Sequence, residues 1–151
     1  MEYIIVVNPQ ANRIRTNPLL LRKILSQFHT CAAEIFYAKS IASLHARLNL
    51  YRVENDLSNT TICIVGGDGT FKQILEWITQ LPMEEQPALM PVGGGQFNFM
   101  TKYAGFKSGN PIKNLSRVFS PKANLQKKPW RPIMVHDSFS DTKRYGAVVG
   151  N

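Results

Sequence analysis

Short apolar segments alternate with amphipathic ones from the amino terminus to about residue 120. Residues 3–7 and 60–65 are rich in apolar and β-branched side chains, which is typical of strands covered on both faces. Between them, Leu20, Leu21, Ile24, Leu25 and Phe28 recur at helical spacing. This alternation predicts a three-layer αβα fold, in which helices cover both faces of a mostly parallel sheet.

The remaining elements follow from the same patterns and from their capping residues. Residues 33–37 and 88–90 are predicted strands, and residues 97–104 and 111–119 are predicted helices. Asn17-Pro18, Ser40, and Thr70 with Gln73 as a capping box are the expected helix starts. The helix after Ser40 has its apolar stripe at Ile41, Leu44, Leu48 and Tyr51 or Val53, and the helix after Thr70 has its stripe at Phe71, Ile74, Leu75 and Ile78. Beyond Pro121 the pattern changes to short strand-like pieces at 125–128, 133–135 and 145–149.

The net charge of +8 lies in the last third of the chain, because residues 101–151 hold ten basic and two acidic side chains. Such a stretch attracts an anionic membrane surface, nucleic acid or phosphate, although a merely solvated basic face is the alternative. No recognised nucleic-acid motif accompanies it. Cys31 and Cys63 fall next to and within predicted strands, without zinc-site spacing, so both are expected to be buried free thiols. No apolar run suits a signal peptide, which favours the cytoplasm.

Three turns of small and polar residues directly follow predicted strands. They are Asn8-Pro9, the first glycine turn (Gly66-Gly67-Asp68-Gly69-Thr70) and the second glycine turn (residues 93–98, with Gly93, Gly94, Gly95 and Asn98). In an open parallel sheet, ligands bind beyond the carboxyl ends of the strands. The three turns should therefore converge on one binding site.

The first glycine turn has the chemistry of a phosphate site. Glycines allow the main chain to approach a ligand, and a helix that starts after the turn adds unpaired N–H groups. Asp68 repels a bare phosphate, so its carboxylate suits Mg²⁺, a ribose hydroxyl or main-chain N–H groups. A plain strand-to-helix connection is the alternative. Walker, dinucleotide and nucleophile-elbow motifs are absent.

These residues resemble the diacylglycerol kinase catalytic domain family, which includes sphingosine, ceramide and bacterial lipid kinases. Residues 4–9 read I-I-V-V-N-P, like the opening strand of that family, and residues 66–70 match its G-G-D-G-T. Residues 91–105 resemble its third motif, P-x-G-G-T-x-N followed by a glycine seven residues later. NAD kinases share G-G-D-G-T but generally lack the Asn-Pro pair, so the resemblance favours lipid kinases.

The sequence departs from the family pattern at several presumed nucleotide contacts. Ala11-Asn12 replace the usual Ser-Gly, Gln96 replaces the threonine of the third motif, and Gln73 replaces a glutamate. One extra residue lies between Pro91 and the glycines. Family members are roughly twice as long and add a β-rich second domain. We therefore expect residues 1–121 to form the nucleotide-binding domain and residues 122–151 to begin a truncated second domain.

The resemblance implies an ATP-dependent lipid kinase that uses Mg²⁺ and phosphorylates a diacylglycerol-like hydroxyl at an anionic membrane surface. Asn8, Pro9, Gly66, Gly67, Asp68, Gly69, Thr70, Gly94, Gly95 and Asn98 would bind the nucleotide, with Asp68 positioning its magnesium. The family's general base lies in the second domain, so we expect this chain alone to be inactive. An NAD kinase-like enzyme and a non-catalytic nucleotide-binding remnant are the alternatives. We expect no specific nucleic-acid partner. We expect the protein to lie in the cytoplasm, with a possible peripheral position at the inner face of the membrane. The sequence leaves open whether the chain forms a homodimer.

Overall fold

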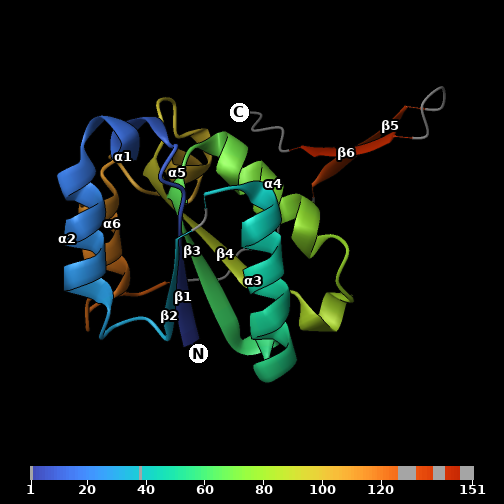
Figure 1. Ribbon diagram of the computed structural model, residues 1–151, viewed down its shortest axis with the longest axis horizontal. Coiled ribbons are helices and arrows are strands. Elements are labelled where there is room, and N and C mark those ends of the chain that lie inside the picture. Colours follow the sequence, from blue (N-terminus) through green and yellow to red (C-terminus); the bar gives the residue numbers. More distant parts are fainter. Residues whose placement is uncertain (1, 38, 126–131, 138–141, 147–151) are drawn as a thin grey trace.

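The computed structural model describes residues 2–37, 39–125, 132–137 and 142–146. A parallel sheet of four strands runs in the order β2-β1-β3-β4 (Figure 1). Its strands are β1 (Glu2–Val7), β2 (Glu34–Tyr37), β3 (Thr60–Gly66) and β4 (Ala88–Gly94). The helices are α1 (Asn12–Thr16), α2 (Pro18–Phe28), α3 (Ile41–Glu54), α4 (Asp68–Ile78), α5 (Phe99–Tyr103) and α6 (Pro111–Val118), with short 3₁₀ turns η1 (Leu57–Asn59) and η2 (Met83–Glu85).

Helices cover both faces of this sheet, as the alternating sequence predicts. Ile4 and Val6 of β1 point into a core shared with α3 and α4, whereas Ile5 and Val7 point into a second core shared with α1, α2 and α6. Figure 1 shows these two helical layers on opposite sides of the strands. The three-layer α/β prediction is therefore confirmed, and the carboxyl ends of the strands lie at the end where α1 and α5 are found.

Several predicted helix starts differ from the structure. Ser40 caps α3 through a reciprocal bond pair with Ser43, as expected for a helix start at this residue. Asn17 precedes Pro18 at the first turn of α2 but makes no side-chain cap. The predicted capping box of Thr70 and Gln73 is wrong, because α4 begins earlier, after Gly67. Thr70 is buried inside the first turn and cannot cap it.

The apolar stripes were predicted well, with exceptions at their edges. Phe71, Ile74, Leu75 and Ile78 of α4 are all buried, as are Leu44, Leu48 and Tyr51 of α3. Val53 is 83% exposed and Ile41 is 46% exposed, so neither belongs to the buried α3 stripe, whereas Tyr51 does. The five-residue helix α1 was not predicted, since so short a segment has no measurable periodicity.

Residues after α6 form a separate sheet within the part of the chain that the structure describes. Strands β5 (Ile133–Asp137) and β6 (Thr142–Gly146) pair antiparallel, and β6 lies near α4. The predicted strand at 133–135 is confirmed, the one at 145–149 is described only to Gly146, and that at 125–128 lies outside the described residues beyond Leu125. The division at residue 121 stays a prediction. None of the described helices is long and apolar enough to cross a membrane.

Candidate functional site

The Asn8 turn and the first glycine turn meet directly at the carboxyl end of the sheet. The Asn8 N–H donates to the Val65 carbonyl at 2.9 Å. The Asn8 side-chain amide donates to Thr70 Oγ1 at 2.8 Å, and its Oδ1 accepts from the Gln10 N–H at 2.8 Å. These bonds tie the end of β1 to the first turn of α4.

The two glycine turns touch each other through their main chains. Strands β3 and β4 remain paired up to Gly66 and Gly94, after a register shift beside Ile64. A Cβ on Gly95 would overlap the Cα of Gly67, and a Cβ on Gly66 would lie 2.5 Å from Thr70 Oγ1. Only glycine allows this approach, so the predicted convergence of the three turns is present in the structure.

Asp68 links the first glycine turn to α5. Its carboxylate oxygens accept the N–H of Phe99 at 3.2 Å and the N–H of Met100 at 3.0 Å. Helix α5 has no other side-chain cap, because Asn98 at its N-cap makes none. The sequence left three partners open for Asp68: Mg²⁺, a ribose hydroxyl or main-chain N–H groups. The structure shows the third, because the carboxylate accepts hydrogen bonds from two amides at the start of a helix.

Asn98 shapes the second glycine turn from inside. It is buried and adopts φ 54°, the left-handed conformation that asparagine tolerates better than most residues. Its Oδ1 accepts the Gly95 N–H and its Nδ2 donates to the Gly95 carbonyl, both at 2.9 Å. The side chain therefore holds the turn together, whereas its neighbour Gln96 is exposed at the surface.

The start of α4 is the open part of this arrangement. Gly69 is exposed, and a Cβ built on it would meet nothing within 4 Å. The first N–H groups of a helix have no partner within the helix, and the helix dipole adds partial positive charge there. The eleven-residue α4 therefore presents an anion-binding end beside the two glycine turns and Asn8.

We call the meeting point of Asn8, the two glycine turns and the start of α4 the corner. Arg13 on α1 lies near it and was not among the residues predicted from the sequence. Its Nη2 lies 3.7 Å from the position that a Cβ on Gly109 would occupy, and the same position is 2.5 Å from Asn98 Nδ2. The guanidinium is therefore next to the wall of the second glycine turn. A basic residue five places after Asn8, in a stretch without acidic residues, is the signal that could have identified it.

The two cysteines and Tyr51 do not belong to the corner. Burial raises the pKa of the Cys63 thiol to about 12, whereas Cys31 is exposed in a turn. The prediction of two buried thiols is thus right for Cys63 and wrong for Cys31, because β2 begins only at Glu34. Burial, followed by the charge of Glu2, raises the pKa of Tyr51. Among the described residues, no group of three or more His, Cys, Asp or Glu could hold a metal.

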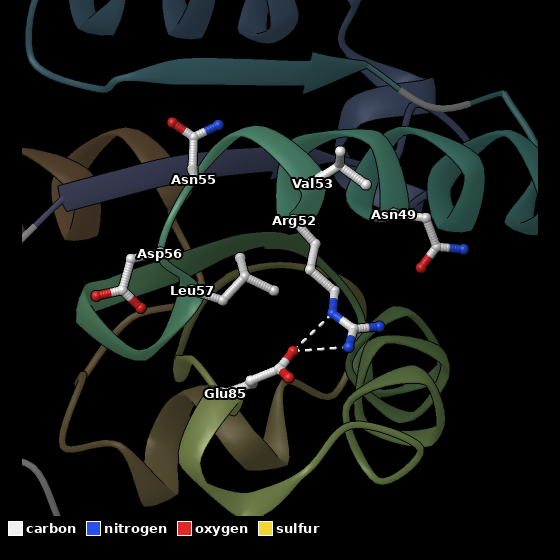
Figure 2. A pocket seen from close by; sticks show the side chains of 7 residues that line it. All are labelled: Asn49, Arg52, Val53, Asn55, Asp56, Leu57 and Glu85. Atoms are coloured by element: carbon white, nitrogen blue, oxygen red, sulfur yellow. Dashed lines mark hydrogen bonds and ion pairs between the residues drawn. The ribbon is translucent and has the colours of Figure 1, made fainter.

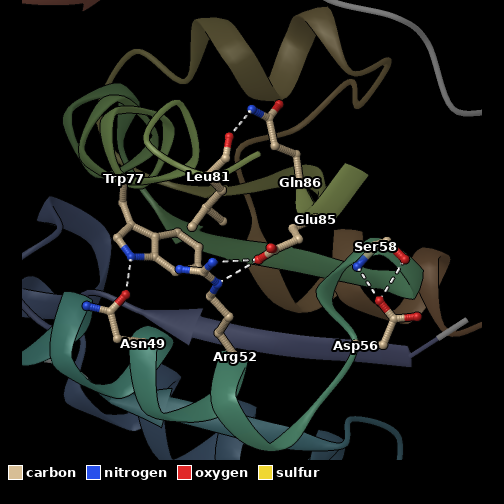
Figure 3. Close-up of polar contacts among 8 residues, drawn as sticks. All are labelled: Asn49, Arg52, Asp56, Ser58, Trp77, Leu81, Glu85 and Gln86. Carbon is tan, nitrogen blue, oxygen red and sulfur yellow. Dashed lines mark hydrogen bonds and ion pairs between the residues drawn. The ribbon is translucent and has the colours of Figure 1, made fainter. Parts of the chain in front are cut away.

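A separate hollow of about 650 Å³ lies at the opposite edge of the sheet, where β3 and β4 begin. It is lined by Asn49, Arg52, Val53, Asn55, Asp56, Leu57 and Glu85 (Figure 2). Arg52 and Glu85 form an ion pair of 2.7 Å across it. Figure 3 shows that neighbouring polar groups are paired locally, as Trp77 Nε1 is with Asn49 Oδ1 at 2.8 Å. This hollow holds no predicted site residue.

Comparison with known proteins agrees with this arrangement. The family model described as the diacylglycerol kinase catalytic domain matches residues 2–125. A search of curated proteins finds no significant match. Similar solved structures come from Bacillus anthracis strain Sterne: one is described as a diacylglycerol kinase (TM-score 0.59, 21% identity, covering 78% of this chain and 42% of that one). Two others, provisionally assigned to that activity, have TM-scores of 0.60 and 0.61, with 21% identity and coverage of 78% and 41%.

The structural likeness shows a shared fold, and this chain spans about 41% of the length of those proteins. The match to the family model covers more of the chain than the structural matches do. It includes all four strands of the parallel sheet and every helix from α1 to α6. It also includes Asn8, both glycine turns and Asp68, which together form the corner described above. The chain therefore belongs to the diacylglycerol kinase catalytic domain family.

Proposed function

We propose that this chain is the nucleotide-binding part of a lipid kinase, which transfers the γ-phosphoryl group of ATP to the hydroxyl of a diacylglycerol-like lipid. The observation that carries the proposal is the open start of α4 at Gly69, beside two glycine turns whose main chains touch. Amides that converge on one space suit a polyphosphate, which needs many donors at short range.

The roles of individual residues follow from their geometry. The main chain of Gly66, Gly67, Gly69 and Thr70 would contact phosphate oxygens, and Gly94 and Gly95 would form the facing wall. Pro9 directly follows Asn8 and would lie at the border of the nucleotide site. Asn8 and Asn98 would act by fixing these turns, because their side chains are bonded to Thr70 and to Gly95. In phosphoryl transfer, such positioning and the neutralisation of charge account for most of the catalysis.

Magnesium fits this corner as part of the nucleotide complex. Mg²⁺ commonly takes one or two carboxylates together with phosphate oxygens and waters. The described residues offer Asp68, whose two oxygens already accept main-chain N–H groups but keep further lone pairs. Asp68 would therefore touch the metal through one remaining lone pair or through a water. When bound, the metal would neutralise charge on the phosphates.

A variant at Gly69 tests the nucleotide site. Gly69→Leu adds a side chain where the folded protein has open space, so the fold should persist and the anion site should be filled. We expect calorimetric titration to show Mg-ATP binding to the wild type and a loss of at least about tenfold in the variant. Ala42→Leu, which adds bulk on the exposed side of α3, is the matched control. Equal ATP affinity in all three proteins would refute the site.

The choice of substrate needs a second measurement. Radiolabelled ATP is offered with diacylglycerol and with NAD in parallel, using the natural protein in which this domain occurs. Label in lipid supports the lipid kinase, and label in NADP supports the NAD kinase alternative. ATP binding without transfer to either acceptor would favour a non-catalytic nucleotide-binding protein in the same family.

A further inference from the structure

Three aromatic side chains are exposed beside the candidate nucleotide corner. Phe97 is 63% exposed, Phe99 58% and Tyr103 47%, and we call this set the aromatic rim. The rings of Phe97 and Phe99 are stacked, with centroids 6.1 Å apart and an interplanar angle of 15°. Singly exposed apolar residues need no explanation, but a contiguous cluster often marks an interaction site.

The backbone under the rim is fixed from below. Asn98, between the two phenylalanines, is buried and bonded twice to Gly95. Asp68 holds the N–H groups of Phe99 and Met100. A partner that binds this surface therefore has to order little of the chain, and this lowers the entropic cost of binding.

The surroundings of the rim are basic. Lys102 Nζ lies 5.9 Å from the centre of the Phe99 ring. At the end of α5, the Arg117 guanidinium donates to the Gly105 carbonyl at 3.3 Å and lies over the Phe106 ring. The described segment 86–125, which contains the rim, has five basic side chains and no acidic one. Asp68 contributes a negative charge here, and its oxygens are engaged by main-chain amides.

We propose that the aromatic rim, with Lys102 and the basic residues around it, is the surface by which this chain docks on an anionic lipid bilayer. Aromatic side chains partition into the interface between headgroups and acyl chains, and lysine and arginine bind the phosphates above it. A second copy of the chain would bring two basic surfaces together, and these repel. Nucleic acid would need free ring faces for base stacking, whereas the Phe99 ring already contacts Phe97 and Lys102.

This inference rests on the proposed lipid kinase function and gives it a geometry. Phe97 is two residues from Gly95, whose main chain touches Gly67 of the first glycine turn. Docking through the rim would place the nucleotide corner at the bilayer surface, which is where the hydroxyl of a diacylglycerol-like lipid lies. The transferred phosphoryl group would then have a short path to its acceptor.

The test is co-sedimentation of the chain with vesicles of phosphatidylcholine, with and without phosphatidylserine. Neither diacylglycerol nor ATP is present, so the result does not depend on nucleotide binding. We expect binding to the anionic vesicles that weakens in high salt, and a loss of about tenfold or more in Phe97→Ser/Phe99→Ser and in Lys102→Glu. All three side chains are exposed, and thermal unfolding verifies that the variants fold.

Matched controls separate this surface from general stickiness. Leu50→Ser/Val53→Ser removes two apolar side chains of α3 that are 62% and 83% exposed, and Lys23→Glu reverses an exposed charge on α2. Both controls should bind like the wild type. Equal binding to neutral vesicles, no binding to anionic vesicles, or an equal loss in the controls would overturn the docking surface. ATP binding that persists in the absence of vesicle binding would refute the docking alone.

Discussion

At the residue scale, the corner depends on glycines at positions with no space for a side chain. Two asparagines, Asn8 and Asn98, stabilise the turns by hydrogen bonds to Thr70 and Gly95. A Cβ at Gly66 or Gly95 would collide with Thr70 or Gly67, whereas Gly69 faces open space. Gly95 therefore serves the contact between the two turns, Gly66 makes room for Thr70 within the first turn, and Gly69 leaves room for a ligand. The sequence shows glycine at all three positions and cannot separate these purposes, since they differ only in what lies opposite each residue.

Arg13 is expected to contribute to ATP binding through its charge. Its guanidinium lies beside Gly109 and Asn98, at the wall of the second glycine turn. Arg13→Ala should weaken ATP about tenfold and adenosine little, because an exposed cation acts mainly on the phosphates. Arg15→Ala, which removes an exposed charge on the same short helix, is the control and should change neither affinity. Isothermal titration measures both, and equal effects of the two variants would contradict a specific role for Arg13.

The two cysteines should react very differently with a thiol reagent. Cys31 is exposed, whereas Cys63 is fully buried with its pKa raised to about 12 by burial. At pH 8, mass spectrometry should find one modified thiol in the folded protein and two in urea. Because the folded-state pKa is raised above 9.0, the associated stabilisation is complete below pH 9 and is lost as the pH rises toward 12. Rapid modification of Cys63 in the native protein would contradict its burial.

Sequence patterns predicted Cys63 but not Cys31, and the difference is physical. Cys63 lies in the middle of a β-branched run, whose burial follows from its composition. Cys31 lies at the edge of a weaker pattern, where the exact start of a strand depends on its neighbours in the sheet. Asp68 is similar: the sequence left open metal, ribose or main chain as its partner, and the choice depends on a helix 31 residues away.

At the element scale, α5 depends on the side chain of another helix. Its own N-cap, Asn98, is turned inward to Gly95, so Asp68 of α4 supplies the acceptors for its first amides. Exposed polar residues usually cap their own helix, which is the pattern that sequence analysis detects. A cap supplied from 31 residues away leaves no local signature. The Thr70 box was wrong for another reason, since α4 starts after Gly67 and has no side-chain cap, whereas the Ser40 cap is local and was predicted.

Removal of the Asp68 carboxylate should loosen α5 and the second glycine turn. Asp68→Ala leaves the N–H groups of Phe99 and Met100 without their acceptor, at a cost of about 0.5–2 kcal/mol, which is usual for the loss of a helix cap. We expect faster hydrogen exchange at these two amides and a lower urea midpoint. Asp56→Ala, which removes the carboxylate that binds Ser58, is the control and should leave exchange at residues 99 and 100 unchanged.

The same variant separates the two roles of Asp68. If the carboxylate acts through α5, Asp68→Ala weakens ATP with and without magnesium to a similar extent. If it acts on the metal, the loss is confined to Mg-ATP, and exchange at Phe99 and Met100 stays as in the wild type. Calorimetry in the presence of magnesium and of a chelator distinguishes these outcomes.

The whole molecule is the level that the sequence predicts best. Alternating strands and helices, with short connections, leave few alternatives to a parallel sheet covered on both faces, and the strand order β2-β1-β3-β4 places all three turns at one edge. The general location of the site follows from that topology alone. What topology cannot supply is the detail of side-chain pairing, which decides whether Asp68 faces a ligand or an amide.

The carboxylates available at the corner lead to a prediction about catalytic turnover. Phosphoryl transfer to a hydroxyl requires a positioned nucleotide and a group that accepts the hydroxyl proton. The described residues place one carboxylate at the corner, Asp68, and its oxygens are engaged by α5. We therefore expect this 151-residue chain to bind Mg-ATP and yet to form almost no phosphatidic acid from radiolabelled ATP and diacylglycerol in mixed micelles. Rapid product formation that Gly69→Leu abolishes would show that the corner contains its own base, and Asp68 would then be the first residue to examine.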